Sequence, residues 1–159
     1  MIYNAYRIEK PKIPTKPPLG VVNRLVKMSG LRYERKVIQE LKRFYGVLSV
    51  EQNPWFEYVG ENKIPRICSP DALIHLPTND IIVVEIKLTD TPTAFDKLKT
   101  IYIPVLRSAL SKERSVRSLI PLVICKNLTQ ISPKPSITLS DALNEPIPLL
   151  HWIGKYNLI

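Results

Sequence analysis

Three charged residues stand within two strongly apolar segments of this 159-residue chain. Asp71 lies in SPDALI, and Glu85 and Lys87 lie in IIVVEIKL. Burying a charge is costly, so charges in such segments indicate a site that uses them. If Asp71 and Glu85 lie side by side, they repel, and one takes up a proton unless a cation lies between them. The pattern therefore predicts a divalent ion with oxygen ligands, for which Mg²⁺ is well suited.

The same residues also have a purely structural interpretation. Side chains alternate between the two faces of a strand, so Glu85 and Lys87 project from one face and Ile86 from the other. In that case Glu85 and Lys87 would form an ion pair at the edge of a sheet, and a salt bridge would link this pair to the N-terminal helix. The residue types and their spacing leave both interpretations open.

The strands predicted around these residues would bring them together. Strands are expected at about 47–51, with a continuation near 55–59, and then at 67–76 and 81–88. The turn residues Pro77-Thr78-Asn79-Asp80 predict a hairpin between the last two. Asp71 and Glu85 are almost equidistant from that turn, so the hairpin would place them side by side. The nearly continuous apolar run at 81–88 predicts a central strand that is covered on both faces.

A carboxylate also falls on the apolar stripe of the first predicted helix. Helical spacing runs from about 19 to 45 and ends at Gly46. Leu31 and Ile38 mark the apolar face, and Glu34 lies between them. A buried carboxylate requires a partner such as a metal ion, a lysine or a hydrogen-bond network, so Glu34 joins the candidate site residues.

The remaining elements define the fold class. A second helix is predicted over 93–110 and must be kinked or divided at Pro104, and a further strand is predicted over 119–125. The order is therefore helix, three strands, helix, strand. It predicts an α/β fold with a mixed central sheet flanked by helices.

The chain is predicted to be one domain over 1–159. Residues 1–19 are expected to be an extended arm rich in Pro and Lys, and 30–126 the catalytic core. The C-terminal extension, 127–159, is proline-spaced and irregular. It has room for one helical turn after Ser140 and a short strand at 149–153.

Charge and cysteine usage limit the partners and the compartment. Lys and Arg total 23 against 14 Asp and Glu, which gives a net charge of +9. That excess favours nucleic acid or an anionic membrane face, although solubility alone also explains it. No apolar run is long enough to cross a membrane, and no signal peptide is recognisable. Cys68 and Cys125 do not make a disulfide scaffold and zinc-ligand spacings are absent, so a reducing, cytoplasmic location is expected.

The chemistry-bearing residues match a known family signature. Pro70-Asp71, thirteen intervening residues and Glu85-Ile86-Lys87 resemble the motif of the PD-(D/E)XK nuclease superfamily. This superfamily includes restriction enzymes, lambda exonuclease, RecB-type nuclease domains and Holliday junction resolvases. Its αβββαβ core agrees with the predicted element order, and Glu34 fills the place of a glutamate common on its first helix. The resemblance covers about 30–107 and implies a restriction-endonuclease-like core.

The resemblance also implies a mechanism. Asp71, Glu85 and the carbonyl of Ile86 would hold Mg²⁺, with Mn²⁺ as a substitute. The metal would polarise the scissile phosphate and activate a water molecule. Lys87 would orient that water and stabilise the charge that develops on the phosphate. Glu34 would bind a second metal ion or a water molecule.

Four further residues are predicted to contact nucleic acid. Many exonuclease-like members carry a Gln and a Tyr on the helix after the metal-binding strand, and Lys97 and Tyr102 occupy that region here. With Lys99 and Arg35 they complete the predicted contacts. A packing or solvent role suits Tyr102 and Lys99 about equally well, and a solvated helix face explains Arg35 slightly better.

These observations predict a Mg²⁺-dependent nuclease that hydrolyses phosphodiester bonds of DNA, of the kind found in phages and mobile elements. The alternatives are a Holliday junction resolvase, an RNA-directed nuclease, and a catalytically silent nucleic-acid-binding module on the same fold. A homodimer would suit an enzyme that cuts both strands. Three nearby aromatic residues can stack on bases, but packing explains them better: Trp55, Phe56 and Tyr58.

Overall fold

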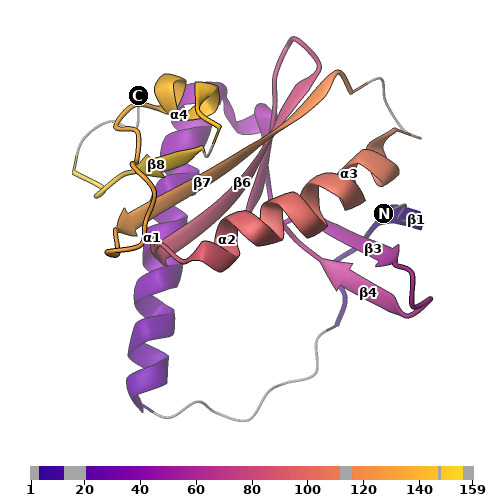
Figure 1. The fold of residues 1–159 in the computed structure, drawn as a ribbon, viewed down its shortest axis with the longest axis horizontal. Helices are drawn as coiled ribbons and strands as arrows, with labels where there is room; N and C mark the ends of the chain where they lie inside the picture. Colours follow the sequence, from indigo (N-terminus) through magenta and orange to yellow (C-terminus); the bar gives the residue numbers. More distant parts are fainter. Residues whose placement is uncertain (1–3, 13–20, 112–115, 147, 156–159) are drawn as a thin grey trace.

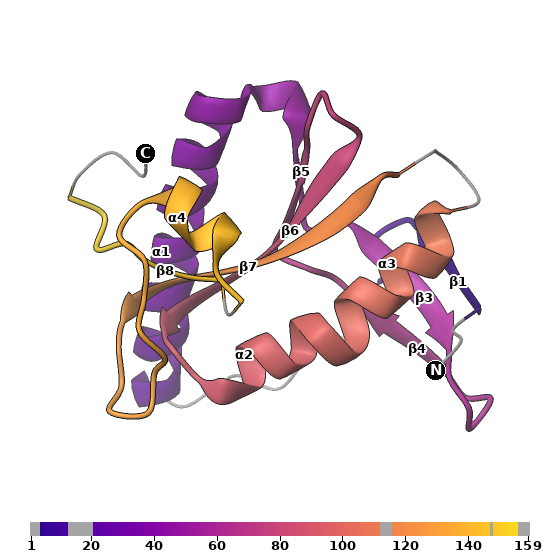
Figure 2. The ribbon, with the colours of Figure 1, turned by 45° about the horizontal axis from the view of Figure 1, so that its top comes forward.

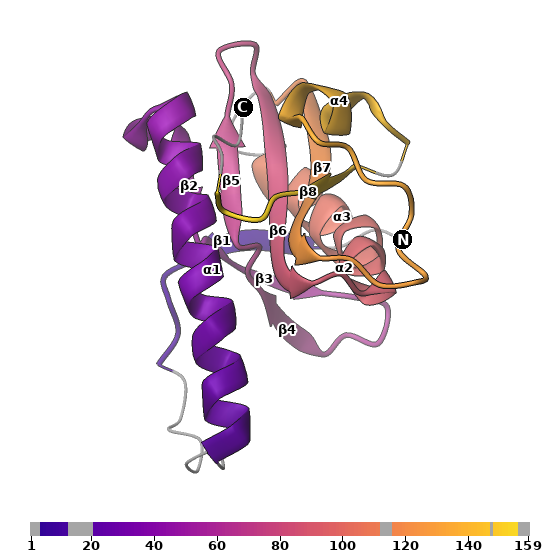
Figure 3. The same ribbon diagram turned by 90° about the vertical axis from the view of Figure 1, so that its left-hand side faces the viewer.

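A five-stranded sheet lies between one long helix and a pair of shorter helices (Figures 1 and 3). The structure is a computed structural model that describes residues 4–12, 21–111, 116–146 and 148–155. In chain order the elements are β1 (Asn4–Ile8), α1 (Val21–Tyr45), the 3₁₀ turn η1 (Val47–Ser49), β2 (Val50–Gln52), β3 (Trp55–Val59), β4 (Pro65–Cys68), β5 (Ala72–His75), β6 (Asp80–Thr89), α2 (Pro92–Lys97), the π-helical segment η2 (Leu98–Tyr102), α3 (Ile103–Leu110), β7 (Ser118–Asn127), α4 (Leu139–Asn144) and β8 (Leu149–His151).

The large sheet is mixed, as predicted. Its order is β2-β5-β6-β7-β8; β2, β5 and β6 are antiparallel, and β6, β7 and β8 are parallel. Residues 80–86 of β6 are buried. The prediction of a central strand covered on both faces is therefore confirmed, and the mixed α/β class is confirmed with it.

The predicted hairpin is confirmed in detail. His75 pairs with Ile81, and the Leu76 N–H donates to the Asp80 carbonyl at 2.9 Å. Asn79 has a φ of 63°, in the left-handed region that Asn tolerates better than most residues. This turn fixes the register that brings the start of β5 opposite the middle of β6.

Two strand predictions were wrong. The segment from 47 to 59 was expected to continue as one strand, but β2 joins the large sheet and β3 joins a separate three-stranded sheet with β1 and β4. The strand expected at 67–76 is likewise divided into β4 and β5. Pro54 and Pro70 lie at the two divisions, and proline lacks the N–H that a sheet ladder requires.

The N-terminal arm expected over 1–19 was also wrong in part, because residues 4–8 form β1. This strand pairs antiparallel with β3, and the small sheet packs on α3 (Figure 2). Phe56 and Tyr58 are buried in that interface, as their packing interpretation predicted, whereas Trp55 is only half-buried. Part of the predicted arm, 13–20, lies outside the described residues.

Helix α1 ends where predicted, but its apolar face starts later. Gly46 has a φ of 89°, and its N–H donates to the Lys42 carbonyl at 3.0 Å. Val37 and Leu41 are fully buried against the large sheet, whereas Leu31 is 42% exposed. Leu31 is therefore not a core residue, because the N-terminal half of α1 projects beyond the sheet (Figure 3).

Pro104 divides the second helix, as predicted, by way of a π-helical segment. The Ile103 N–H donates to the Leu98 carbonyl, five residues back. Pro104 then follows within the first turn of α3, where its missing N–H is not needed. The two helices stay joined end to end along one face of the sheet (Figure 2).

The C-terminal extension is more regular than predicted. α4 starts at the predicted helical turn, with Thr138 accepting a hydrogen bond from the Asp141 N–H. β8 pairs parallel with β7 and completes the large sheet. In the described part of the chain, no helix is long and apolar enough to cross a membrane.

Candidate active site

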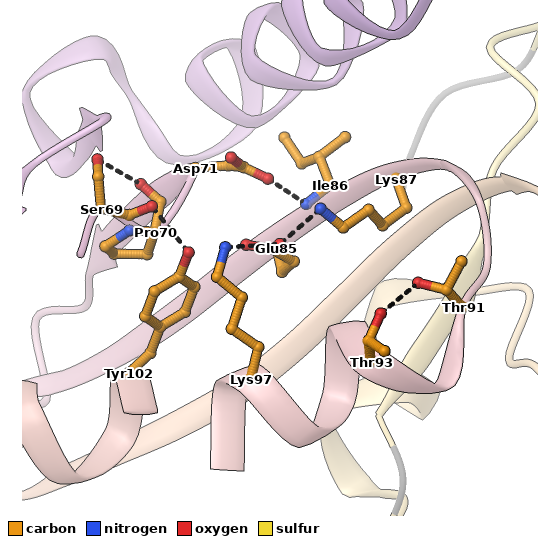
Figure 4. Close-up of polar contacts among 10 residues, drawn as sticks. All are labelled: Ser69, Pro70, Asp71, Glu85, Ile86, Lys87, Thr91, Thr93, Lys97 and Tyr102. Carbon is orange, nitrogen blue, oxygen red and sulfur yellow. Dashed lines mark hydrogen bonds and ion pairs between the residues drawn. The ribbon is translucent and has the colours of Figure 1, made fainter. Parts of the chain in front are cut away.

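The site forms around Glu85, which β6 directs to the α2 side of the sheet (Figure 4). The Glu85 side chain is only 1% exposed. Lys87 lies two residues along on the same face, and its Nζ is 2.7 Å from Glu85 Oε1. The predicted juxtaposition of these two side chains is confirmed.

A second cation contacts the same carboxylate from the helix layer that covers this face of the sheet. Lys97 Nζ, at the end of α2, lies 3.4 Å from Glu85 Oε1. It also lies 4.7 Å from the centre of the Tyr102 ring, a distance suited to a cation–π contact. Lys97 is therefore held beside Glu85 by two contacts. The resemblance had suggested Lys97 for substrate contact, but nothing in the sequence indicated its pairing with Glu85.

The other oxygen of this carboxylate is unsatisfied. Glu85 Oε2 is buried and accepts no hydrogen bond from the described residues. Leaving a buried acceptor unpaired is unfavourable by roughly 1–3 kcal/mol, and by more when the group is charged. An orphaned carboxylate oxygen inside a charged site is therefore a candidate ligand for a group that the protein alone does not supply.

Asp71 lies next to Glu85, at the junction of β4 and β5. Its N–H donates to the Val84 carbonyl at 3.1 Å, and its Oδ2 accepts the Ile86 N–H at 2.6 Å. Burial raises the pKa of Asp71 to about 7, and the nearby charge of Glu85 contributes to this rise against the opposing Ile86 hydrogen bond. The repulsion predicted between the two carboxyl groups is thus present.

Lys87 is held in its charged form by these acids. Burial by itself lowers the pKa of Lys87, but its hydrogen bond to Glu85 and the charges of Glu85, Asp71 and Glu34 together raise it above its usual value. Lys87 therefore remains an ammonium group at neutral pH. That state is required of a group that stabilises developing negative charge.

Glu34 reaches this site from the other side of the sheet. It is half-buried on α1, and its charge contributes to the raised pKa values of Asp71 and Lys87. This influence is electrostatic, and a direct partner of Glu34 stays a prediction. Arg35 and Lys99 are exposed, and the described residues show no contact that brings either of them to the site.

Tyr102 is buried and contacts the backbone that precedes Asp71. Its ring is 1% exposed, and its hydroxyl donates to the Ser69 carbonyl at 2.9 Å. Burial raises the pKa of Tyr102, and the charges of Glu85 and Asp71 raise it further. A ring so deeply buried has no surface for nucleic acid, so Tyr102 positions the β4–β5 link that carries Asp71.

The donor set fits a divalent cation that keeps several water ligands. Glu85 offers its orphaned Oε2, and Asp71 lies beside it, so that added positive charge would relieve the repulsion between the two acids. No three His, Cys, Asp or Glu side chains gather into a ligand group within the described ranges. Two carboxylates with water and substrate oxygens are, however, a usual environment for Mg²⁺. The predicted use of the Ile86 carbonyl stays a prediction, because the contact seen is made by its N–H.

A scan against protein-family models, a search of curated proteins and a search of solved structures each find no match for this chain.

Proposed function

We propose that this protein is a divalent-metal-dependent nuclease that hydrolyses phosphodiester bonds of DNA. The observation that carries the proposal is the buried Glu85 carboxylate, which has one oxygen paired with two lysines and the other without a partner among the described residues. Asp71 lies beside it with a raised pKa. Two acids and two cations in one pocket suit a metal ion and an anionic substrate.

The order of elements around the large sheet also supports this proposal. α1, β2, β5, β6, the α2–α3 pair and β7 follow one another in the αβββαβ order that the motif resemblance implies. Asp71 immediately precedes β5 and Glu85 lies within β6, the two strands of the central hairpin. The proposal thus includes a restriction-endonuclease-like core, extended by β8 at one edge.

Each group would have a distinct task in hydrolysis. Asp71 and Glu85 would hold the metal ion, which supplies Lewis-acid activation of the phosphate and of the attacking water. Lys87 would donate to the phosphate oxygen on which charge develops. Lys97 would hold a second non-bridging oxygen. Glu34 and Tyr102 would act as positioning residues, because neither needs to touch the substrate.

A catalytically silent nucleic-acid-binding module is the second candidate. The observation in its favour is that Lys87 and Lys97 already neutralise Glu85, as they would in a purely structural ion cluster. Such a module would bind nucleic acid through the basic surface that a net charge of +9 implies. It would show no metal-dependent chemistry.

One assay separates the two candidates. The full chain is incubated with labelled single-stranded, double-stranded, flap and four-way DNA and with RNA, in Mg²⁺, in Mn²⁺ and in EDTA. We expect cleavage of DNA that needs the metal. Lys87→Ala should slow it roughly 10²–10³-fold, the cost of removing one group that stabilises transition-state charge. Lys126→Ala, an exposed lysine on the neighbouring β7, is the matched control.

The outcomes are distinct. Binding without metal-dependent cleavage of any substrate would favour the silent module. Undiminished cleavage by Lys87→Ala would show that the active site lies elsewhere. Preferred cutting of the four-way substrate would identify a junction resolvase, and preferred cutting of RNA would change the substrate class.

A further inference from the structure

A groove of about 870 Å³ lies between α1 and the segment that leads into β3, and the mechanism above does not use it. One wall comes from α1, through Lys27 and Leu31. The facing wall comes from 52–55, which connects β2 to β3, and the end of β1 closes the groove through Ile8 and Lys10. We call this feature the α1 groove.

The α1 groove adjoins the backbone that carries Asp71. The Asn53 N–H, in the groove wall, donates to the Asp71 carbonyl at 3.0 Å. On the other wall, Leu31 lies three residues before Glu34 and Lys27 lies seven before it, so all three share one face of α1. A chain lying in the groove would therefore pass from Lys27 toward Glu34 and Asp71.

The groove carries unneutralised positive charge. Its one acid among the described residues, Glu51, is paired with Arg7 and lies 3.2 Å from His75 Nε2, so these charges largely cancel. Lys10 and Lys27 are exposed, and neither forms an ion pair within the described part of the chain. Two such ammonium groups in a concave surface attract phosphates.

The groove also offers apolar surface. Trp55 is half-buried, and Leu31 is 42% exposed although it lies on the apolar side of its helix. Cations that follow a phosphate backbone, combined with an aromatic ring on which bases stack, are the general means of binding single-stranded nucleic acid. A double helix hides the faces of its bases and cannot use such a ring.

We propose that the α1 groove binds a single-stranded segment of the substrate next to the bond that is cut. Its bases stack on Trp55 and Leu31, and its phosphates contact Lys10 and Lys27. Pockets of about 300–1,000 Å³ enclose ligands of drug size, so the groove accommodates a few nucleotides of a single strand. This inference rests on the proposed nuclease function and assigns it to substrates with a single-stranded end or flap.

Binding in EDTA tests the groove without cleavage. Fluorescein-labelled oligothymidylate, oligouridylate and a blunt duplex are titrated with the full chain, and anisotropy is measured at several salt concentrations. Trp55→Ala should weaken binding of both single strands roughly tenfold, as expected when one base no longer stacks on an aromatic ring. Trp55→Phe keeps a ring and should restore most of the affinity.

A charge change on α1 provides the second measurement. Lys27→Glu should weaken single-strand binding and reduce the slope of log K against log salt by about 0.7 for each phosphate that is no longer neutralised. Lys36→Glu is the matched control, because nine residues along an α-helix place it about 180° from Lys27. Duplex affinity should be unchanged in every variant.

The results separate this inference from the proposed function. One such result is that both Trp55→Ala and Lys27→Glu bind single strands as tightly as the wild type, with melting temperatures that show both variants to be folded. That result would overturn the proposed binding groove even if the enzyme cuts DNA. Equal reductions in affinity for duplex and single strand would overturn it as well. Groove-dependent binding without metal-dependent cleavage of any substrate would support the groove and reject the nuclease.

Discussion

The Ile86 amide donates a 2.6 Å hydrogen bond to the carboxylate of Asp71. Asp71 just precedes β5, whereas Ile86 lies within β6, so this bond ties the position of an acidic side chain to the register of the central hairpin. A slip of one residue would turn Glu85 to the opposite face and break the bond. The site geometry is therefore set by the same pairing that closes the turn at 77–80.

The raised pKa of Asp71 predicts an unusual pH dependence of stability in the metal-free protein. Between about pH 4 and pH 7 the folded protein retains a proton that the unfolded chain loses, so the free energy of unfolding falls as the pH rises through this window. Asp71→Asn removes this dependence. In EDTA, the variant should match the wild type near pH 4 and be more stable at pH 8 by a few kcal/mol.

Urea unfolding at several pH values measures this effect. Asn retains an oxygen for the Ile86 N–H, which makes it a conservative replacement. Parallel curves for variant and wild type between pH 4 and pH 8 would show that the carboxyl group is not destabilised in the folded state.

Divalent metal should reduce that difference in stability. The proposed Mg²⁺ site exists only in the folded protein, so Mg²⁺ at one hundred times its dissociation constant should add about 2.7 kcal/mol of stability. Thermal melts at pH 8 should therefore shift upward by several degrees for the wild type and hardly at all for Glu85→Gln or Asp71→Asn. Equal shifts for all three proteins would locate the metal outside this pocket.

Two lysines on the helix that follows β6 offer a matched comparison. Lys97 contacts Glu85, whereas Lys99 is exposed. Lys97→Ala should slow cleavage at saturating substrate, about tenfold or more, because it removes a fixed cation from the reacting phosphate. Lys99→Ala should leave the maximal rate unchanged and, at most, raise the substrate concentration that gives half of that rate. Equal reductions of the maximal rate in both variants would show that Lys97 is not part of the site.

Tyr102 should prove important for stability rather than for substrate binding. Tyr102→Phe leaves the Ser69 carbonyl without its donor, at a cost of roughly 1–3 kcal/mol in the free energy of unfolding. Tyr6→Phe is the control, since its hydroxyl bond to Glu57 is exposed and should contribute little to the free energy of unfolding. Chemical denaturation compares the two variants, and equal decreases in stability would contradict the positioning role.

Local patterns explain why much of the fold was predictable. The turn at 77–80, the apolar run of β6 and the break at Pro104 each follow from neighbouring residues, and each was predicted from them. The pairing of Glu85 with Lys87 required only the alternation of side chains along one strand. These features depend on contacts that are close in the sequence.

The predictions that were wrong involve contacts between residues that are distant in the sequence. Pro54 is consistent with a break before 55–59, but nothing near this segment indicates that it pairs with residues 4–8. Leu31 carries the correct helical spacing for the core, but the end of the sheet leaves it exposed. The contact between Lys97 and Glu85 joins two layers of the fold, so it depends on how α2 lies across the sheet, which local spacing does not specify.

The π-helical segment 98–102 also affects how relatives of this chain can be recognised. In a regular α-helix, residues five apart differ by about 140° around the axis, so Lys97 and Tyr102 would diverge. The widened turn brings them onto one side, which acts as an insertion of one residue into the helix. An ungapped alignment with a protein that has a regular helix here would match only one of these two residues to its true counterpart.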